Sequence, residues 1–130
     1  MIGLDTNVIV RYLTRDDPAQ TAAAVKLLDS LAPDEPGFLS LVVVVELVWV
    51  IESFYDAGKN EIERVLEILL SNDRLVVERS EIVWQALRKF GTSRSGFSDC
   101  LIAQCGQAAA CDYTVTFDKR AAGAGMRLLI

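Results

Sequence analysis

The sequence contains no histidine, and this absence excludes a large class of chemistry. Without imidazole side chains the protein has no histidine general base and no histidine metal ligand. Cysteine is scarce: Cys100, Cys105 and Cys111 are five and six residues apart, spacings that match no zinc, haem or thioredoxin motif. Any metal site in this chain is therefore expected to use oxygen ligands.

The cysteine usage and the hydropathy pattern favour a cytoplasmic protein without a membrane segment. An odd number of cysteines, and a start without a secretory signal pattern, favour a reducing compartment, so we expect small core cysteines and no disulfide. The longest apolar run, Leu41–Ile51, is interrupted by Glu46 and is far shorter than the roughly 20 residues that cross a bilayer.

Positive charge is in deficit, with a net charge of −5, which argues against a broad basic surface for nucleic acid. Two bound divalent cations would add four positive charges and change the net charge from −5 to −1. The charge therefore does not exclude a phosphate-containing substrate. A length of 130 residues with 52% hydrophobic residues predicts a single domain that spans residues 1–130.

Short apolar segments alternate with helical patterns along the chain. Strands are expected at residues 1–4, 38–39, 75–77, 113–117 and 127–130. Helices are expected at 8–15, 18–31, 60–70, 80–90 and 97–110, and another begins after Ser40 and ends before Gly58. The valines of that helix favour a strand, but the length of the apolar run favours a buried helix. The alternation predicts an α/β fold with a mostly parallel sheet and helices on both faces.

Four acidic residues stand in apolar surroundings: Asp5, Glu46, Asp99 and Asp118. A carboxylate withdrawn from water is costly unless it is paired, hydrogen-bonded or bound to a metal. Asp5 and Asp118 each follow an expected strand, where ligands of open α/β sheets gather. If those two strands are neighbours, the side chains approach each other. A cluster of carboxylates is stable near neutral pH chiefly with a divalent cation, and oxygen ligands favour Mg²⁺ or Mn²⁺.

Each acid also has a structural explanation that stays open at this point. Asp5 and Asp118 are placed to cap the helices that follow them, and Asp99 suits the dipole of a first helical turn. Glu46 lies mid-helix, so its alternative is an internal ion pair with lysine or arginine. Nearby side chains have structural explanations too: Arg11, Arg15, Lys119 and Arg120 as solvated surface rather than phosphate contacts, and Trp49 and Trp84 as core rather than base-stacking surfaces.

Four segments in this order, LDTNVIVRYL, SLVVVVELVWVIE, FSDCLIA and CDYTVTFDK, make the chain resemble a PIN-domain ribonuclease of the VapC toxin type. The motifs cover nearly the whole chain and are specific as a set. The family's metal-binding acids match Asp5, Glu46, Asp99 and Asp118. Supporting positions match as well: Thr6 and Asn7 in the first-motif turn and Thr116 before the last acid. Ser98 departs slightly, since the family often has alanine there.

The resemblance implies a three-layer α/β sandwich with a five-stranded parallel sheet, and an enzyme that hydrolyses RNA with Mg²⁺ or Mn²⁺. The acids would be catalytic by holding metal that activates water. The resemblance also implies a cognate antitoxin that blocks the acidic site, and a toxin homodimer.

Two other functions remain as alternatives. In one, Asp5 accepts a phosphoryl group as a nucleophile, although proteins of that kind usually have a further acid where Thr6 and Asn7 stand here. In the other, the chain is a non-catalytic interaction module whose acids bind a metal or a basic peptide. Titration with Mn²⁺ separates an enzyme site from a surface that binds peptide alone.

Overall fold

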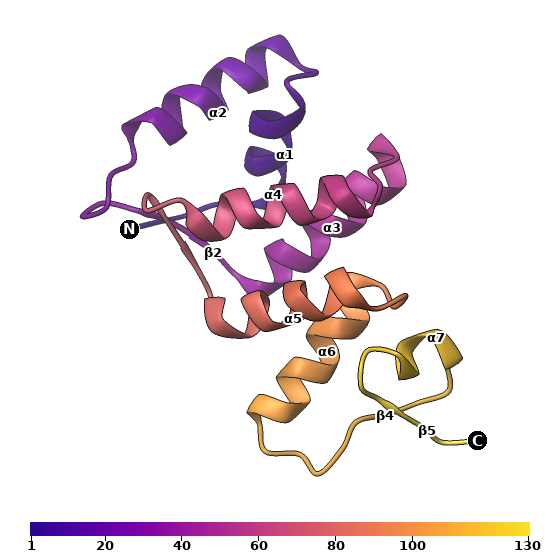
Figure 1. Cartoon of the computed structure of the whole chain (residues 1–130). Coiled ribbons are helices and arrows are strands. Elements are labelled where there is room, and N and C mark those ends of the chain that lie inside the picture. The colour runs from indigo at the N-terminus through magenta and orange to yellow at the C-terminus, as the bar shows by residue number, and fades with distance from the viewer. The chain divides into compact units, whose positions relative to one another are not determined.

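The structure, a computed structural model, describes residues 1–130, and the chain divides into two compact units (Figure 1). Unit 1 is Met1–Glu78 and unit 2 is Arg79–Ile130. Unit 1 contains β1 (Ile2–Gly3), α1 (Thr6–Thr14), α2 (Pro18–Ser30), β2 (Gly37–Leu39), α3 (Leu41–Tyr55), α4 (Lys59–Ser71) and β3 (Leu75–Val77). Unit 2 contains α5 (Ser80–Thr92), α6 (Phe97–Ala108), β4 (Val115–Thr116), α7 (Lys119–Ala122) and β5 (Arg127–Leu128).

All strands pair in parallel, which confirms the α/β class and the expected strand positions. In unit 1 the order is β1-β2-β3, with Gly37 of the central strand opposite Ile2 and Leu75. In unit 2, β4 pairs with β5, with Val115 opposite Arg127. Unit 1 thus contains a three-stranded parallel sheet and unit 2 a two-stranded one. The single sheet of five strands that the resemblance implied stays a prediction. The prediction of a single domain over residues 1–130 stays a prediction.

Two helix starts in unit 1 follow the capping signals of the sequence. The Asp17 side chain accepts a hydrogen bond from Gln20 N at 3.0 Å, and Pro18 occupies the first position of α2. Ser40 Oγ accepts from Val43 N at 3.2 Å at the start of α3. The valine-rich segment after Ser40 is therefore a helix, as its length predicted. Its C-terminal end is the left-handed residue Asp56, and Gly58 instead precedes α4.

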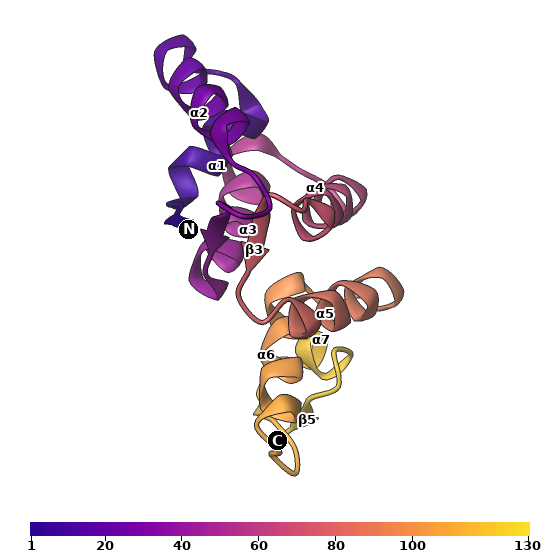
Figure 2. The ribbon, with the colours of Figure 1, turned by 90° about the vertical axis from the view of Figure 1, so that its left-hand side faces the viewer.

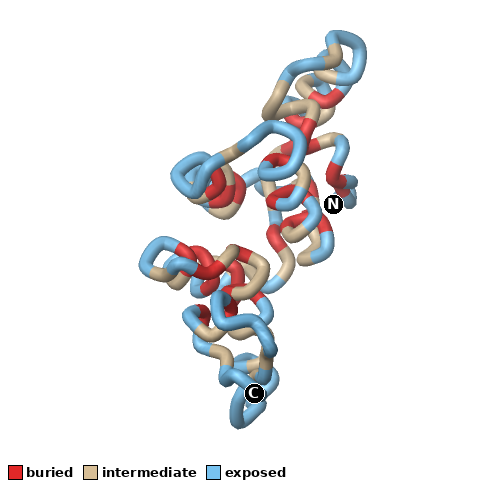
Figure 3. Tube along the Cα trace, turned by 90° about the vertical axis from the view of Figure 1, so that its right-hand side faces the viewer, coloured by how far each residue is buried: buried red, intermediate tan, exposed pale blue.

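The core of unit 1 lies where α1, α3 and the sheet meet, and α1 packs against both α2 and α3 (Figure 1). Leu39 of the central strand and Leu47 of α3 are completely buried. Gly37 leaves room for leucine side chains in this core: a Cβ there would lie 2.8 Å from Leu4 Cδ1 and 3.0 Å from Leu31 Cδ1, so these side chains would have to shift. In Figure 3 the buried positions recur along the helices, while the connecting loops are mostly exposed.

The core of unit 2 is the contact between α5 and α6, which pack against each other (Figure 2). Phe90 and Phe97 meet edge to face, with ring centroids 6.0 Å apart, a favourable geometry for aromatic pairs. No disulfide joins the three cysteines, and their expected place in the core holds only for Cys100, since Cys105 is half-buried and Cys111 is exposed. None of the helices has the length and apolar character needed to cross a bilayer.

Candidate functional site

The four acids are divided equally between the units. Asp5 and Glu46 belong to unit 1, and Asp99 and Asp118 belong to unit 2. Neither unit alone brings three or more acidic or cysteine side chains together as a metal site.

Asp5 occupies the N-cap position of α1, yet its side chain forms no capping hydrogen bond. The residue has extended backbone geometry, and its carbonyl oxygen accepts from Val8 N at 3.1 Å. Its carboxylate is exposed and makes no hydrogen bond or ion pair within the chain. The capping explanation for Asp5 is thus wrong, and both carboxylate oxygens are available to a ligand.

Glu46 is held by a hydroxyl rather than by a cation. Thr6 is the first residue of α1 and is 3% exposed, and its Oγ1 donates to Glu46 Oε1 at 2.5 Å. The ion pairs Met1–Glu35 and Arg11–Asp16 do not involve Glu46. The ion-pair explanation is wrong. Thr6, expected to support the site, fixes one oxygen of Glu46, while the other has no partner.

Glu46 is exposed, so the premise that it is withdrawn from water is wrong. Residues three and four apart share a helix face, which puts Glu46 on one exposed stripe of α3 with Val42 and Trp49. Trp49 is 56% exposed and meets Phe54 edge to face at 5.5 Å, so its assignment to the core is wrong as well. Because α3 has apolar residues on every side, its sequence does not indicate which face is buried in the core. Trp84 is half-buried.

In unit 2, Asp99 stands in the first turn of α6, where an acid suits the helix dipole. It is half-buried and has no hydrogen bond or ion pair within the chain. Its local position therefore agrees with the structural explanation and leaves both carboxylate oxygens unoccupied.

Asp118 caps α7, as the structural explanation from the sequence predicted. Its Oδ1 accepts from Arg120 N at 2.8 Å, and Oδ2 has no hydrogen bond. Thr116, a supporting residue in the prediction, accepts from Asp118 N through its Oγ1 at 3.0 Å. The capping bond fixes the direction of this carboxylate and does not use the second oxygen.

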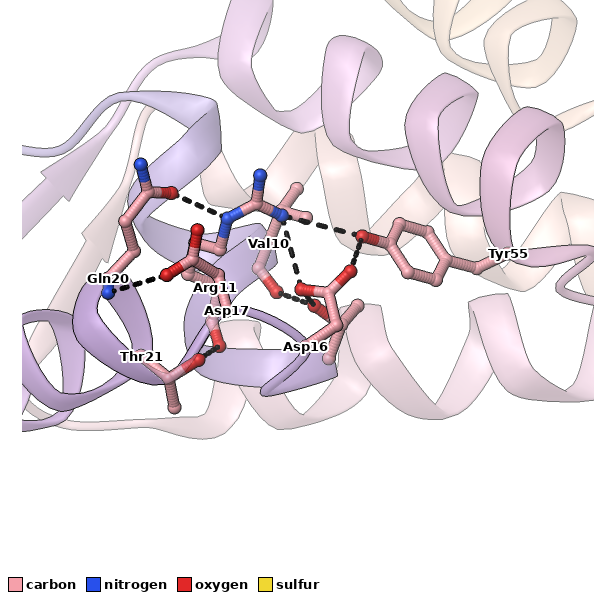
Figure 4. Close-up of polar contacts among 8 residues, drawn as sticks. Val10, Arg11, Asp16, Asp17, Gln20, Thr21 and Tyr55 are labelled. Carbon is pink, nitrogen blue, oxygen red and sulfur yellow. Dashed lines mark hydrogen bonds and ion pairs between the residues drawn. The ribbon is translucent and has the colours of Figure 1, made fainter.

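A polar network that the sequence did not reveal joins three helices of unit 1 (Figure 4). Arg11 Nε donates to Gln20 Oε1 at 2.7 Å, and its Nη1 pairs with Asp16 Oδ1 at 3.2 Å. Tyr55, the last residue of α3, donates to Asp16 Oδ2 at 2.6 Å, and this bond above all holds the pKa of Asp16 below its ordinary value. The guanidinium of Arg11 is therefore engaged within the fold rather than simply solvated.

Other predicted neighbours of the acids have varied positions. Asn7 is exposed and lines a groove of about 370 Å³ between α1 and α2, together with Arg11. Arg15 stacks over the Tyr12 ring at 5.5 Å. Arg120 Nε donates to Arg94 O at 2.9 Å. Of the four cations near the acids, Arg11, Arg15 and Arg120 thus have partners in the chain, which no pattern in the sequence indicated.

The donor set fits a hard divalent cation. All four side chains offer carboxylate oxygens, and each retains at least one oxygen without a partner in the chain. Oxygen ligands of this kind suit Mg²⁺ and Mn²⁺, whereas the thiolate or imidazole typical of zinc sites is missing from the set. Local structure therefore leaves all four acids able to bind metal.

Comparison with known proteins agrees with the motifs. The PIN domain model matches residues 2–125. The chain is also 23% identical over 117 residues to a VapC ribonuclease of Aquifex aeolicus (strain VF5), an alignment that covers 90% of this chain and 87% of that protein. Because the PIN domain match spans almost the whole length, the chain belongs to the PIN-domain family.

Proposed function

We propose that the chain is a metal-dependent endoribonuclease of the VapC toxin type. The observation that carries this proposal is the free carboxylate of Asp5. This residue follows β1 and stands at the start of α1, yet its side chain makes no capping hydrogen bond. A carboxylate kept at such a position without a structural bond is suited to a ligand. Membership of the PIN-domain family and similarity to a VapC ribonuclease support the same reading.

In this proposal the four acids Asp5, Glu46, Asp99 and Asp118 are the metal ligands. Mg²⁺ or Mn²⁺, when bound, supplies activation of water for attack on an RNA phosphodiester and stabilisation of the departing oxygen. The acids act as ligands and none is a nucleophile. Thr6 orients Glu46, Thr116 holds the backbone of Asp118, and Asn7 supports the turn after Asp5.

The proposal includes the partners that a VapC-type toxin has. RNA is the substrate, a cognate antitoxin blocks the acidic site, and two toxin chains form a homodimer in the cytoplasm. Light scattering of the purified chain tests the dimer. Co-purification with the protein encoded beside it tests the antitoxin, because a true antitoxin must also suppress cleavage in a stoichiometric mixture.

The direct test is cleavage of labelled RNA by wild-type protein and by Asp5→Asn and Asp99→Asn. Each variant replaces one carboxylate oxygen by an NH2 group, which removes the negative charge and leaves the size of the side chain nearly unchanged. We expect cleavage with Mg²⁺ or Mn²⁺, none with chelator, and a loss of about 100-fold or more in both variants, because stabilisation by metal contributes several kcal/mol to the barrier.

Asp29→Asn and Asp112→Asn are matched controls, since both positions are exposed and lie outside the predicted set. They should cut RNA at the wild-type rate. Melting temperatures of all variants verify that each is folded. A folded Asp5→Asn protein that cuts at the wild-type rate, or cleavage that persists in chelator, would overturn the proposed function.

A further inference from the structure

Ser95 is a buried hydroxyl in the short loop between α5 and α6. It is 2% exposed, and Thr6 is the other polar residue with such burial. Its Oγ donates to Arg120 O at 2.5 Å, so the loop before α6 is bonded to α7. Buried hydroxyls need such a partner, because an unsatisfied polar group inside a protein is costly.

Arg120 accepts this bond through its carbonyl oxygen, which also accepts from Gly123 N at 3.2 Å, and it makes further bonds within unit 2. Its backbone N donates to Asp118 Oδ1 at 2.8 Å, and its Nε donates to Arg94 O at 2.9 Å. Ser95 and Arg94 therefore bind the backbone and the side chain of the same residue. That residue in turn fixes the direction of the Asp118 carboxylate.

The other end of this connection reaches Asp99. Ser95 directly precedes Gly96, the N-cap residue of α6, whose carbonyl oxygen accepts from Cys100 N at 3.2 Å. Asp99 lies in the same first turn. A continuous series of bonds thus runs from the turn that carries Asp99, through Ser95 and Arg120, to Asp118.

We propose that Ser95 is a positioning residue that sets the separation of Asp99 and Asp118 for metal binding. This inference rests on the proposed function, in which Asp99 and Asp118 both bind metal. Ser95 itself does not bind the metal. Groups that orient metal ligands typically change affinity or activity by 10- to 100-fold when they are removed.

The test compares Ser95→Ala with Thr92→Ala in the full chain. Thr92 is a matched control because it is a nearby exposed hydroxyl that donates only to Lys89 O, at the end of α5. Calorimetric titration with Mn²⁺ should show affinity about 10-fold weaker for Ser95→Ala and unchanged for Thr92→Ala. Amides of α7 should exchange with deuterium faster in Ser95→Ala, even without metal. RNA cleavage by this variant should fall at limiting Mn²⁺ and recover at saturating Mn²⁺.

A second variant reaches the same contact from the other side. A Cβ at Gly123 would lie 3.1 Å from Ser95 Oγ and 3.3 Å from Arg120 O, so Gly123→Ala should weaken Mn²⁺ binding in the same direction. If Ser95→Ala does not fold, the Mn²⁺ affinity of Gly123→Ala tests the role of Ser95 instead.

Three results would overturn the role of Ser95: unchanged Mn²⁺ affinity in these variants, unchanged exchange in α7, or cleavage that stays low at saturating Mn²⁺. If the wild-type chain binds Mn²⁺ and cuts RNA while Ser95→Ala matches it, only this inference fails. Wild-type protein that binds no Mn²⁺ overturns the proposed function as well.

Discussion

Thr6 Oγ1 lies 2.5 Å from Glu46 Oε1, a hydrogen bond between residues 40 positions apart in the sequence. It joins the first residue of α1, next to Asp5, to the middle of α3. Because the hydroxyl donates, the bond directs one carboxylate oxygen toward the start of α1 and leaves the other available. The two acids of unit 1 are therefore related through a single buried side chain.

Replacement of Thr6 by valine should distinguish the hydrogen bond to Glu46 from the packing of the Thr6 side chain. Valine keeps the shape of threonine but cannot donate to Glu46, so we expect metal affinity to fall by about 10- to 100-fold. The loss of one hydrogen bond should lower the free energy of unfolding by about 1 kcal/mol. Thr6→Ser retains the hydroxyl and should stay close to wild type in Mn²⁺ titration. Equal affinities of Thr6→Val and Thr6→Ser would show that the bond does not matter for metal.

Asp118 has a capping role and a proposed ligand role, and two substitutions distinguish them. Asparagine caps helices about as well as aspartate, so Asp118→Asn should unfold at the wild-type denaturant concentration yet lose cleavage. Asp118→Ala should lose cleavage and about 1 kcal/mol of stability. Urea unfolding and an RNA cleavage assay measure both properties. If Asp118→Asn retained full activity, capping alone would explain this residue.

The order and type of the elements could be predicted because their signals are local. Asp17-Pro18 and Ser40 specify helix starts through their own backbone neighbours, and these bonds are present. The sheet partners of short strands depend on long-range packing, which a single sequence does not encode locally.

The supports of the site could be predicted less well than the acids themselves. Glu46 looked buried because apolar residues flank it, yet only packing decides which face of α3 is covered. No sequence signal marks Ser95, whose importance comes from a bond to a residue 25 positions away. Tyr55 likewise reaches Asp16 across 39 positions. Such contacts depend on how helices pack rather than on local residue patterns.

A side chain at Gly37, on the central strand of unit 1, should lower the stability of the fold. A Cβ there would lie 2.8 Å from Leu4 Cδ1 and 3.2 Å from Leu75 Cδ2, closer than packed carbon atoms normally approach. Overpacking of this kind costs about 1–3 kcal/mol, so Gly37→Ala should unfold at a lower urea concentration. Gly3 is a matched control on the neighbouring strand, because nothing lies within 4 Å of its added Cβ. Equal destabilisation of Gly3→Ala would point to backbone entropy or local geometry instead.

The bond from Tyr55 to Asp16 should make stability depend on pH. This bond, followed by the one from Thr14, lowers the pKa of Asp16, so the folded state favours the ionised carboxylate. Its contribution is complete above the ordinary carboxyl pKa of about 4 and is lost as the pH falls through the lowered value. Tyr55→Phe should raise the pKa of Asp16 in an NMR titration. Its stability deficit should be largest at pH 7 and smaller at pH 3.

Tyr12→Phe is the control for this change. The Tyr12 ring stacks under Arg15 on the same helix as Arg11, and its hydroxyl has no partner in the Asp16 network. It should leave both the Asp16 titration and the pH profile of unfolding unchanged. A deficit in Tyr55→Phe that is the same at pH 3 and pH 7 would instead assign the effect to packing at the end of α3, because loss of a hydroxyl that favours an ionised partner must weaken with protonation of that partner.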